Sequence, residues 1–267
     1  MNDRIKVEMK DGVADVRLVR ADKMNALDDA MFKALAETGE KLKTQKGLRA
    51  VVLSGEGRAF CAGLDMGNFG KMASSERRGG MEFVEAKRTE GGSNSAQHAV
   101  MVWREIPVPV IAAVHGVAFG GGFQLTLGAD IRIMAPDTKL SILEIKWGLI
   151  PDMAGLVLLR GLLRDDVARV LTFTGRIFTG EEALTLGLAT RVSANPHADA
   201  MKLAIEIAGK SPDAIRAGKR LFNLAADADQ KTTLLQETKE QIALIGSPNQ
   251  VEAVMSNMQK RAANYAD

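Results

Sequence analysis

Hydrophobic and polar residues alternate at the start of the chain and change to helical spacing further on. In IKVEMKDGVADVRLV, apolar side chains alternate with polar ones on both sides of Asp11-Gly12, a dipeptide typical of a tight hairpin turn. From Asn25 to Lys46 the apolar residues instead recur on one face of a helix, and Asn25 or Asp28 stands near a plausible cap. The pattern therefore predicts a β-hairpin followed by an amphipathic helix.

Four short apolar runs predict buried strands. They are LRAVVLSG (48–55), VPVIAAVHG (108–116), ADIRIMA (129–135) and KLSILEI (139–145). A glycine-containing loop follows each of the first two runs, and helical sequence follows the second loop. This recurrence of strand, loop and helix predicts an α/β fold with much parallel pairing.

The chain divides into two parts by sequence character. Residues 1–195 carry the predicted strands and form the expected core domain, within which 67–99 is rich in Gly, Ser and charge. We interpret 67–99 as a flap over a site, because it directly follows a candidate site loop; a tolerated surface insertion is the alternative. Residues 196–267 read as consecutive helices separated by Pro196 and Ser211-Pro212, with a last helix over 248–263.

Composition narrows the classes of protein that fit. The 267 residues are 46% hydrophobic and 25% charged, and the net charge of +2 gives no electrostatic case for nucleic acid or an anionic membrane. The single cysteine, Cys61, is expected to be a packed side chain in a reducing compartment. The charged N-terminus does not resemble a leader, and no apolar run approaches roughly 18 residues, so we expect a cytoplasmic protein. Neither His98 nor His115 stands at ligand spacing to another His or to Cys61, so we expect no metal site.

Two glycine loops carry the candidate chemistry. GVAFGGGFQLTLGAD (116–130) places three glycines before a helix, but it matches neither the P-loop pattern nor the dinucleotide-binding pattern. Taken alone, the run could simply allow close packing. GRAFCAGLDM (57–66) also leaves a buried strand and offers backbone amides at Ala62 and Gly63. Two such loops can aim two N–H groups at one oxygen, as in an oxyanion hole, and an acidic side chain would then act as base on the adjacent carbon.

Five stretches in this order resemble the crotonase, or enoyl-CoA hydratase/isomerase, superfamily. They are RADKMNALDDAMFKAL, GRAFCAGLDM, AVHGVAFGGGFQLTLGADIRIMAPDTKL, EIKWGLIPDMAG and TGRIFTGEEALTLGLATRV, within a match over roughly 3–265. The resemblance implies a spiral of ββα turns with a helical C-terminal part that builds homotrimers, often paired into hexamers. It implies an acyl-CoA thioester as substrate, in the setting of fatty acid metabolism, and no cofactor beyond the CoA moiety.

The same resemblance assigns binding residues. The thioester carbonyl would sit between the N–H groups of Ala62 and Gly121, which would form the oxyanion hole. The positions that match the family's CoA-contacting segments are Lys23, Ala26, Ala62, Gly63, Leu64, Asp65 and, reaching a neighbouring subunit's CoA, Lys260.

Gln124 is the main departure from the family pattern. Family hydratases use two glutamates to hold one water; the first position is Gln124 here, and the second is Glu144. Since an amide cannot take up a proton, we expect isomerisation by proton transfer through Glu144 ahead of hydration. Asp152 matches an aspartate of the family's dienoyl-CoA isomerases, although an N-cap role near Met153 is equally open. Hydration with Gln124 orienting the water, or a catalytically silent CoA-binding scaffold, are the alternatives. The sequence leaves the acyl chain, the stereochemistry and the pathway open.

Overall fold

The computed structural model describes residues 3–67 and 88–267. The predicted hairpin is present: β1 (Ile5–Lys10) pairs antiparallel with β2 (Val13–Leu18). Asp11 and Gly12 form its turn with φ of 51° and 78°, the left-handed region that such a turn requires. Most of the predicted flap, residues 68–87, lies outside the described residues, so the interpretation of 67–99 as a flap stays a prediction.

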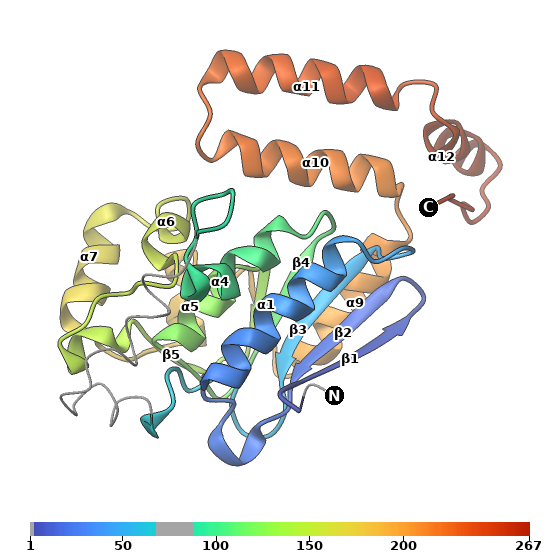
Figure 1. Cartoon of the computed structure of the whole chain (residues 1–267). Coiled ribbons are helices and arrows are strands. Elements are labelled where there is room, and N and C mark those ends of the chain that lie inside the picture. The colour runs from blue at the N-terminus through green and yellow to red at the C-terminus, as the bar shows by residue number, and fades with distance from the viewer. Residues whose placement is uncertain (1–2, 68–87) are drawn as a thin grey trace.

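The main sheet has the strand order β1-β2-β3-β4-β6-β9, and every pair after the first is parallel (Figure 1). Its remaining strands are β3 (Ala50–Gly55), β4 (Val110–Val114), β6 (Ile131–Met134) and β9 (Arg191–Val192). A second, smaller sheet has the order β5-β7-β8 and consists of β5 (Val117–Phe119), β7 (Lys139–Ser141) and β8 (Phe178–Thr179). The predicted strands at 48–55, 108–116 and 129–135 are confirmed.

Helices cover both faces of the main sheet. On one face lie α1 (Asp29–Lys43) and α4 (Ser95–Glu105), and on the other lies α9 (Pro196–Ala208) (Figure 1). Alternate residues of the central strands divide accordingly: Val51 and Leu53 join the core under α1 and α4, whereas Val52 joins the core under α9. Strands buried on both faces read as continuous apolar runs, which is why the sequence pattern identified them.

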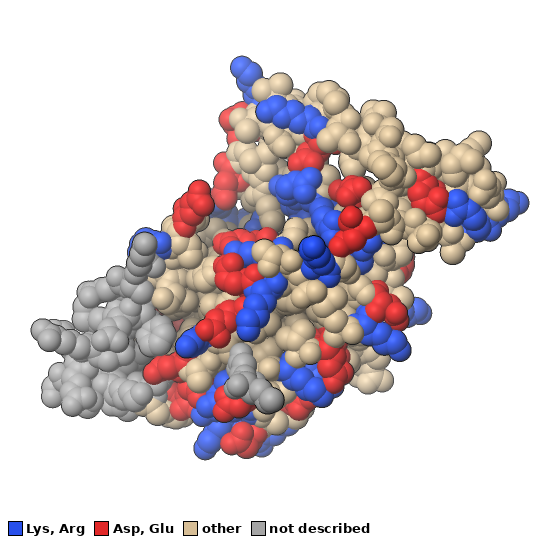
Figure 2. Space-filling model, turned by 45° about the vertical axis from the view of Figure 1, so that its right-hand side comes forward, with Lys and Arg blue, Asp and Glu red and all other residues tan. Residues whose placement is uncertain are grey.

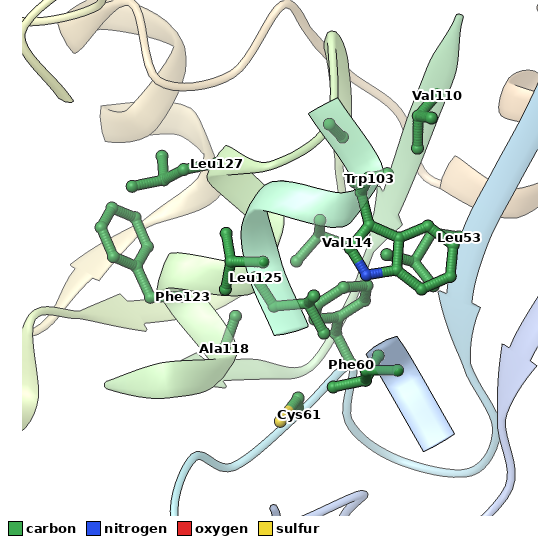
Figure 3. Close-up of a cluster of buried hydrophobic side chains, with 14 of the residues drawn as sticks. Leu53, Phe60, Cys61, Trp103, Val110, Val114, Ala118, Phe123, Leu125 and Leu127 are labelled. Carbon is green, nitrogen blue, oxygen red and sulfur yellow. The ribbon is translucent and has the colours of Figure 1, made fainter. Parts of the chain in front are cut away.

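The larger core surrounds the fully buried indole of Trp103, which packs with Leu53 and Phe60 among others (Figure 3). Cys61 is buried in the same cluster, and burial raises the pKa of its thiol to about 12. The prediction of Cys61 as a packed side chain is therefore confirmed. No helix among the described residues is long and apolar enough to cross a membrane.

Three further helices follow α9 and extend above the sheet (Figure 1). They are α10 (Pro212–Ala225), α11 (Gln230–Leu244) and α12 (Pro248–Met258). Proline occupies the first turn of α9, α10 and α12, where its missing N–H costs nothing. Because α9 packs on the sheet, the C-terminal helices leave the core only from α10 onward.

One predicted strand was too long, and the structure places the starts of two helices. KLSILEI is a strand only over β7, because its second half turns into a 3-10 helix, η2 (Leu143–Trp147), that ends at Gly148 with φ of 68°. The first helix begins after Asp28, whose side chain caps it by accepting from the Met31 N–H, so of the two predicted cap residues it is Asp28 that serves. In the described end of the 67–99 segment, α4 begins at Ser95 behind an Asn94 capping box.

Candidate active site

A cavity of about 1000 Å³ lies where the loops after β2, β3 and β5 meet the 143–153 segment. The predicted residues that line it are Lys23, Ala26, Ala62, Gly63, Leu64, Asp65, Gly121, Glu144 and Asp152. Gln124 lies behind the wall and is buried, with 1% of its surface exposed. The fold thus brings all but one of the candidate residues to a single place; Lys260 is not among the residues that line this cavity.

Three glycines follow β5, and the last two belong to α5 (Gly121–Leu127); each is required for a different physical reason. Gly120 adopts φ of 51°, and a Cβ on it would lie 3.3 Å from Oε1 of Glu144. A Cβ on Gly121 would lie 2.7 Å from Sδ of Met153 in the cavity wall, and a Cβ on Gly122 would lie 2.2 Å from the carbonyl oxygen of Cys61. Close packing therefore explains Gly122, while Gly120 and Gly121 keep side chains away from the cavity.

The amide of Ala62 is not available to a ligand. Its N–H donates to the carbonyl of Met24 at 2.9 Å, so the prediction that Ala62 offers an unshielded amide is wrong. Two residues further on, the N–H of Leu64 has no acceptor among the described residues, and neither has the N–H of Gly121. The two loops are in close contact, since a Cβ on Gly63 would lie 2.5 Å from the Phe119 carbonyl and 3.7 Å from the Gly121 nitrogen. Leu64 and Gly121 therefore place two free amides on this cavity wall.

Glu144 and Gln124 form a directional pair. Nε2 of Gln124 donates to Oε1 of Glu144 at 2.6 Å. Oε1 of Gln124 accepts from the N–H groups of Met153 and Gly155 at 2.8 and 3.0 Å. Oε2 of Glu144 is buried and has no hydrogen-bond partner among the described residues. One oxygen of the carboxylate is thus held by Gln124, and the other is unpartnered among the described residues.

The electrostatics of the site favour a basic carboxylate. Burial raises the pKa of Glu144, the negative charge of Asp152 raises it further, and the hydrogen bond from Gln124 acts in the opposite direction. Partial desolvation also raises the pKa of Asp152, although this residue is exposed. Carboxylates of this kind take up protons more readily than ordinary acids, which suits proton transfer near neutral pH.

Comparison with known proteins agrees with this geometry. Residues 8–267 match the family model described as enoyl-CoA hydratase/isomerase. The chain belongs to the enoyl-CoA hydratase/isomerase family. The fold of the chain is that of the crotonase superfamily of enzymes, as the resemblance implied.

Both branches of the family are among the similar proteins. Mouse mitochondrial methylglutaconyl-CoA hydratase is 31% identical over 261 residues, which cover 95% of this chain and 79% of that protein. Mouse mitochondrial Δ(3,5)-Δ(2,4)-dienoyl-CoA isomerase is also 31% identical, over 266 residues covering 93% of this chain and 77% of that protein. A solved enoyl-CoA hydratase of Bacillus anthracis superposes with a TM-score of 0.88 at 27% identity and covers 98% of both chains.

Asp152 does not cap a helix in this family member. The following helix, α6 (Gly155–Leu159), has Ala154 as its N-cap residue and no capping side chain. The N-cap interpretation of Asp152 is therefore wrong, and its carboxylate instead lines the cavity with Glu144. This placement leaves the chemical interpretation of Asp152 open.

Two polar residues that sequence reasoning missed hold the loops of the site together. Nη1 of Arg20 donates to Asp65 at 2.6 Å and to the Ala26 carbonyl at 3.0 Å. The buried Asn25 accepts from the Arg20 N–H and donates to the carbonyls of Glu56 and Ala59. Both lie in the RADKMNALD stretch, but their roles depend on the loop after β3, more than 30 residues away in the chain.

His98 has close acidic neighbours that its sequence spacing did not reveal. Nε2 of His98 lies 2.9 Å from Glu40, and Glu105 completes a group whose ligand atoms lie within 4.8 Å of one another, between α1 and α4. Lys43 pairs with both carboxylates of this group, so the cluster is an ion-pair network outside the cavity.

Proposed function

We propose that this enzyme acts on an acyl-CoA thioester and moves a proton between two carbons of its acyl chain, with Glu144 as the base. The observation that carries the proposal is the buried, unpartnered Oε2 of Glu144, a residue that lines a cavity whose wall also offers two unused backbone amides. The thioester carbonyl would accept from the N–H groups of Leu64 and Gly121. Leu64 thus takes the place that the sequence had assigned to Ala62.

The proposed reaction needs one base and no second acid. Oε2 of Glu144 removes a proton from the carbon next to the thioester carbonyl, and the electrons of that C–H bond move into the enolate, whose oxygen the two amides hold. The double bond shifts toward the carbonyl as Glu144 returns the proton two carbons further along. No water is consumed, and Glu144 ends in its starting state.

Gln124 supports isomerisation over hydration. Hydration by two acids needs a second group that accepts and returns a proton, which an amide cannot do. Both acceptor sites of the Gln124 oxygen are occupied by backbone N–H groups, and one of its two Nε2–H donors is bonded to Glu144. Gln124 could therefore only donate its second N–H to a water, and it could not accept a proton from that water.

Asp152 supports a second candidate, a dienoyl-CoA isomerisation with two acids. Its charge acts on Glu144, and both carboxyl groups line the same cavity. In that reaction one carboxylate removes a proton at one end of a conjugated system while the other protonates the far end. The similarity to the mouse dienoyl-CoA isomerase is consistent with this route.

A substrate panel tests the proposal. Purified protein is incubated with 3-enoyl-, 2-enoyl- and 3,5-dienoyl-CoA, and products are followed by absorbance and mass. The single-base proposal expects shifted double bonds without a mass change from the 3-enoyl substrate. A gain of one water from 2-enoyl-CoA, at rates far above the others, would establish a hydratase instead. Binding without turnover of any member would support the silent scaffold.

The CoA-binding and assembly expectations are part of the same proposal. We infer that CoA lies along Lys23, Ala26 and the 62–65 loop, with Lys260 of a neighbouring copy reaching it.

Large apolar side chains on α11 and after it are exposed in the single chain: Leu234, Leu235, Ile242 and Ile245, at 52 to 69%. A homotrimer, or a dimer of trimers, would bury them. A monomer by sedimentation at micromolar concentration would contradict the assembly without touching the proposed chemistry.

A further inference from the structure

A second cavity, of about 770 Å³, lies between α10, α6, α4 and the start of β6. Here it is called the α10 cavity. It is separate from the candidate active site, because the two cavities have no lining residue in common. Its volume falls in the range of small-molecule sites, which is about 300–1,000 Å³.

The basic residues that line this cavity outnumber the acidic ones. Lys219 is 7% exposed, and its ammonium donates to Asp130 at 2.7 Å and to the Val108 carbonyl at 2.9 Å. Arg132 is 5% exposed, and its guanidinium donates to the neutral carbonyls of Leu188 and Ala129. Asp130 is thus the carboxylate that Lys219 already uses, and Arg132 has no carboxylate of its own among the described residues.

Arg104 is the third cation and the one with spare donors. It projects from α4, lines the α10 cavity, and its guanidinium makes no hydrogen bond or ion pair with any described residue. Its charge lowers the pKa of both Lys219 and Arg132, although burial is the larger cause for each, and the pKa of Arg132 falls to about 10. The charge of Asp130 raises both pKa values and outweighs the effect of Arg104, but this one carboxylate is shared by three cations, so the site stays net positive.

The remaining wall of the α10 cavity is apolar. Met101, Leu127 and Ile215 contribute to it, and so does Phe222, which is 81% exposed at the edge. Arg160 also lines the cavity, but its guanidinium is already paired with Asp227. The cavity thus combines one unpaired guanidinium, in a positive field, with a hydrocarbon surface.

We propose that the α10 cavity binds a small carboxylate that carries a hydrocarbon chain. A carboxylate matches the planar fork of Arg104, and the chain would cover Met101 and its apolar neighbours. Inorganic phosphate offers the charge without the chain, and an alcohol offers the chain without the charge. The inference does not depend on the proposed function, since it uses none of the residues of the active-site cavity.

Methionine methyl groups make the test specific to one cavity. Met101 lines the α10 cavity, whereas Met153 lines the active-site cavity. The full chain is labelled with ¹³C at its methionine methyl groups, Met101 is assigned with Met101→Leu, and octanoate, octanol and phosphate are titrated separately. We expect octanoate to shift the Met101 signal saturably, octanol to bind at least tenfold more weakly, and phosphate to leave the Met101 signal in place.

Two arginine variants separate the role of Arg104 from general charge. Arg104→Gln removes a charge-assisted contact and should weaken octanoate binding about 10- to 100-fold. The Arg104→Gln variant should fold normally, because the Arg104 guanidinium makes no hydrogen bond or ion pair with any described residue. Arg160→Gln, at the same cavity but already paired, should change the affinity less than about twofold.

Several outcomes would overturn the inference. They are a shift of Met153 alone, equal binding of octanol and octanoate, a Met101 shift with phosphate, or equal effects of the two arginine variants. A different result would also overturn it: the wild-type chain does not bind octanoate, and Arg104→Gln changes the sedimentation of the protein. Arg104 would then bind a carboxylate of a second copy of the chain.

Discussion

Nε2 of Gln124 points at Oε1 of Glu144, because the two backbone N–H groups of Met153 and Gly155 hold the oxygen of the same amide. The reverse orientation would place an amide NH₂ group against two N–H donors, so the direction of the bond is fixed by the chain around it. Gln124 therefore binds Oε1 of Glu144 and leaves Oε2, the atom that the proposed mechanism uses, without a partner among the described residues.

Replacing the proposed base separates its effect on turnover from its effect on substrate binding. Glu144→Gln should lower kcat by at least about 10²–10⁴-fold on the best substrate, because the amide cannot carry the proton. Binding of a CoA thioester should change little, since the amides of Leu64 and Gly121 remain. Isothermal titration and steady-state kinetics measure the two effects, with exposed Glu206→Gln as control. Near-normal turnover would make Asp152 the residue to test.

Substitutions of Asp152 and Gln124, the two neighbours of Glu144, should shift the pH profile of the enzyme in opposite directions. Because its pKa is raised, the active carboxylate is lost as pH falls through a value above the ordinary glutamate pKa. Asp152→Asn removes a charge that raises this pKa, so the acidic limb of kcat/KM should move to lower pH. Gln124→Met removes a hydrogen bond that lowers it, so the limb should move to higher pH. Shifts in the same direction would contradict this electrostatic account.

Sequence patterns predicted the elements whose burial is regular. β3 and β4 are covered on both faces, so their runs of Val, Leu, Ile and Ala were sufficient to identify them. The ILEI stretch looked equally strand-like, but it turns into η2, which places Glu144 in the cavity wall. Its apolar composition does not distinguish these two conformations.

The candidate site was predictable to the level of loops, but individual amides were not. Whether Ala62 or Leu64 offers a free N–H depends on the Met24 carbonyl, which comes from a loop almost 40 residues earlier. Likewise, Arg104 is an ordinary helix residue in the sequence. It becomes notable only because the fold brings α10 and β6 beside it.

The glycine run should tolerate substitution unevenly. Gly122→Ala places a Cβ 2.2 Å from the Cys61 carbonyl, and because backbone must move, it should cost at least about 1–3 kcal/mol of stability. The shift would also displace the loop that carries Leu64, so activity should fall with stability. Gly161→Ala has no atom within 4 Å of the new Cβ and serves as the control. Urea unfolding with equal midpoints for both variants would contradict the close-packing account.

The ion pair between Arg20 and Asp65 should couple the two loops of the cavity. Both side chains are mostly buried, at 16 and 19% exposed, so we expect a coupling energy of about 0.5–3 kcal/mol between Arg20→Met and Asp65→Asn. The N–H of Gly67 and then Arg20 lower the pKa of Asp65, so this stabilisation should be lost as pH falls through that lowered value. The exposed pair Arg176 and Glu182 is a matched control with little expected coupling. Additive effects in the Arg20 and Asp65 cycle would show that the loops are held independently.

The Gln124→Glu variant tests whether hydration is prevented by the lack of a second acid at position 124. One oxygen of the new carboxylate can still accept from the Met153 and Gly155 N–H groups, so the fold should survive. The other oxygen would face Oε1 of Glu144 where the amide donates now, at 2.6 Å. Two carboxylates at that spacing cannot both ionise, so the pair should share one proton, and its two apparent pKa values should separate.

In the singly ionised state the pair could accept a proton from water and return one to the acyl chain. Hydration of 2-enoyl-CoA should then rise by about 10²–10⁴-fold, within a bell-shaped pH range, if the cavity admits water. The double variant Gln124→Glu with Glu144→Gln restores one amide and one acid in exchanged positions. It should lose the gain, because the remaining acid is held by two backbone N–H groups away from the cavity. A folded Gln124→Glu enzyme that binds substrate but hydrates no faster than wild type would show that the amide at position 124 is not what limits water activation.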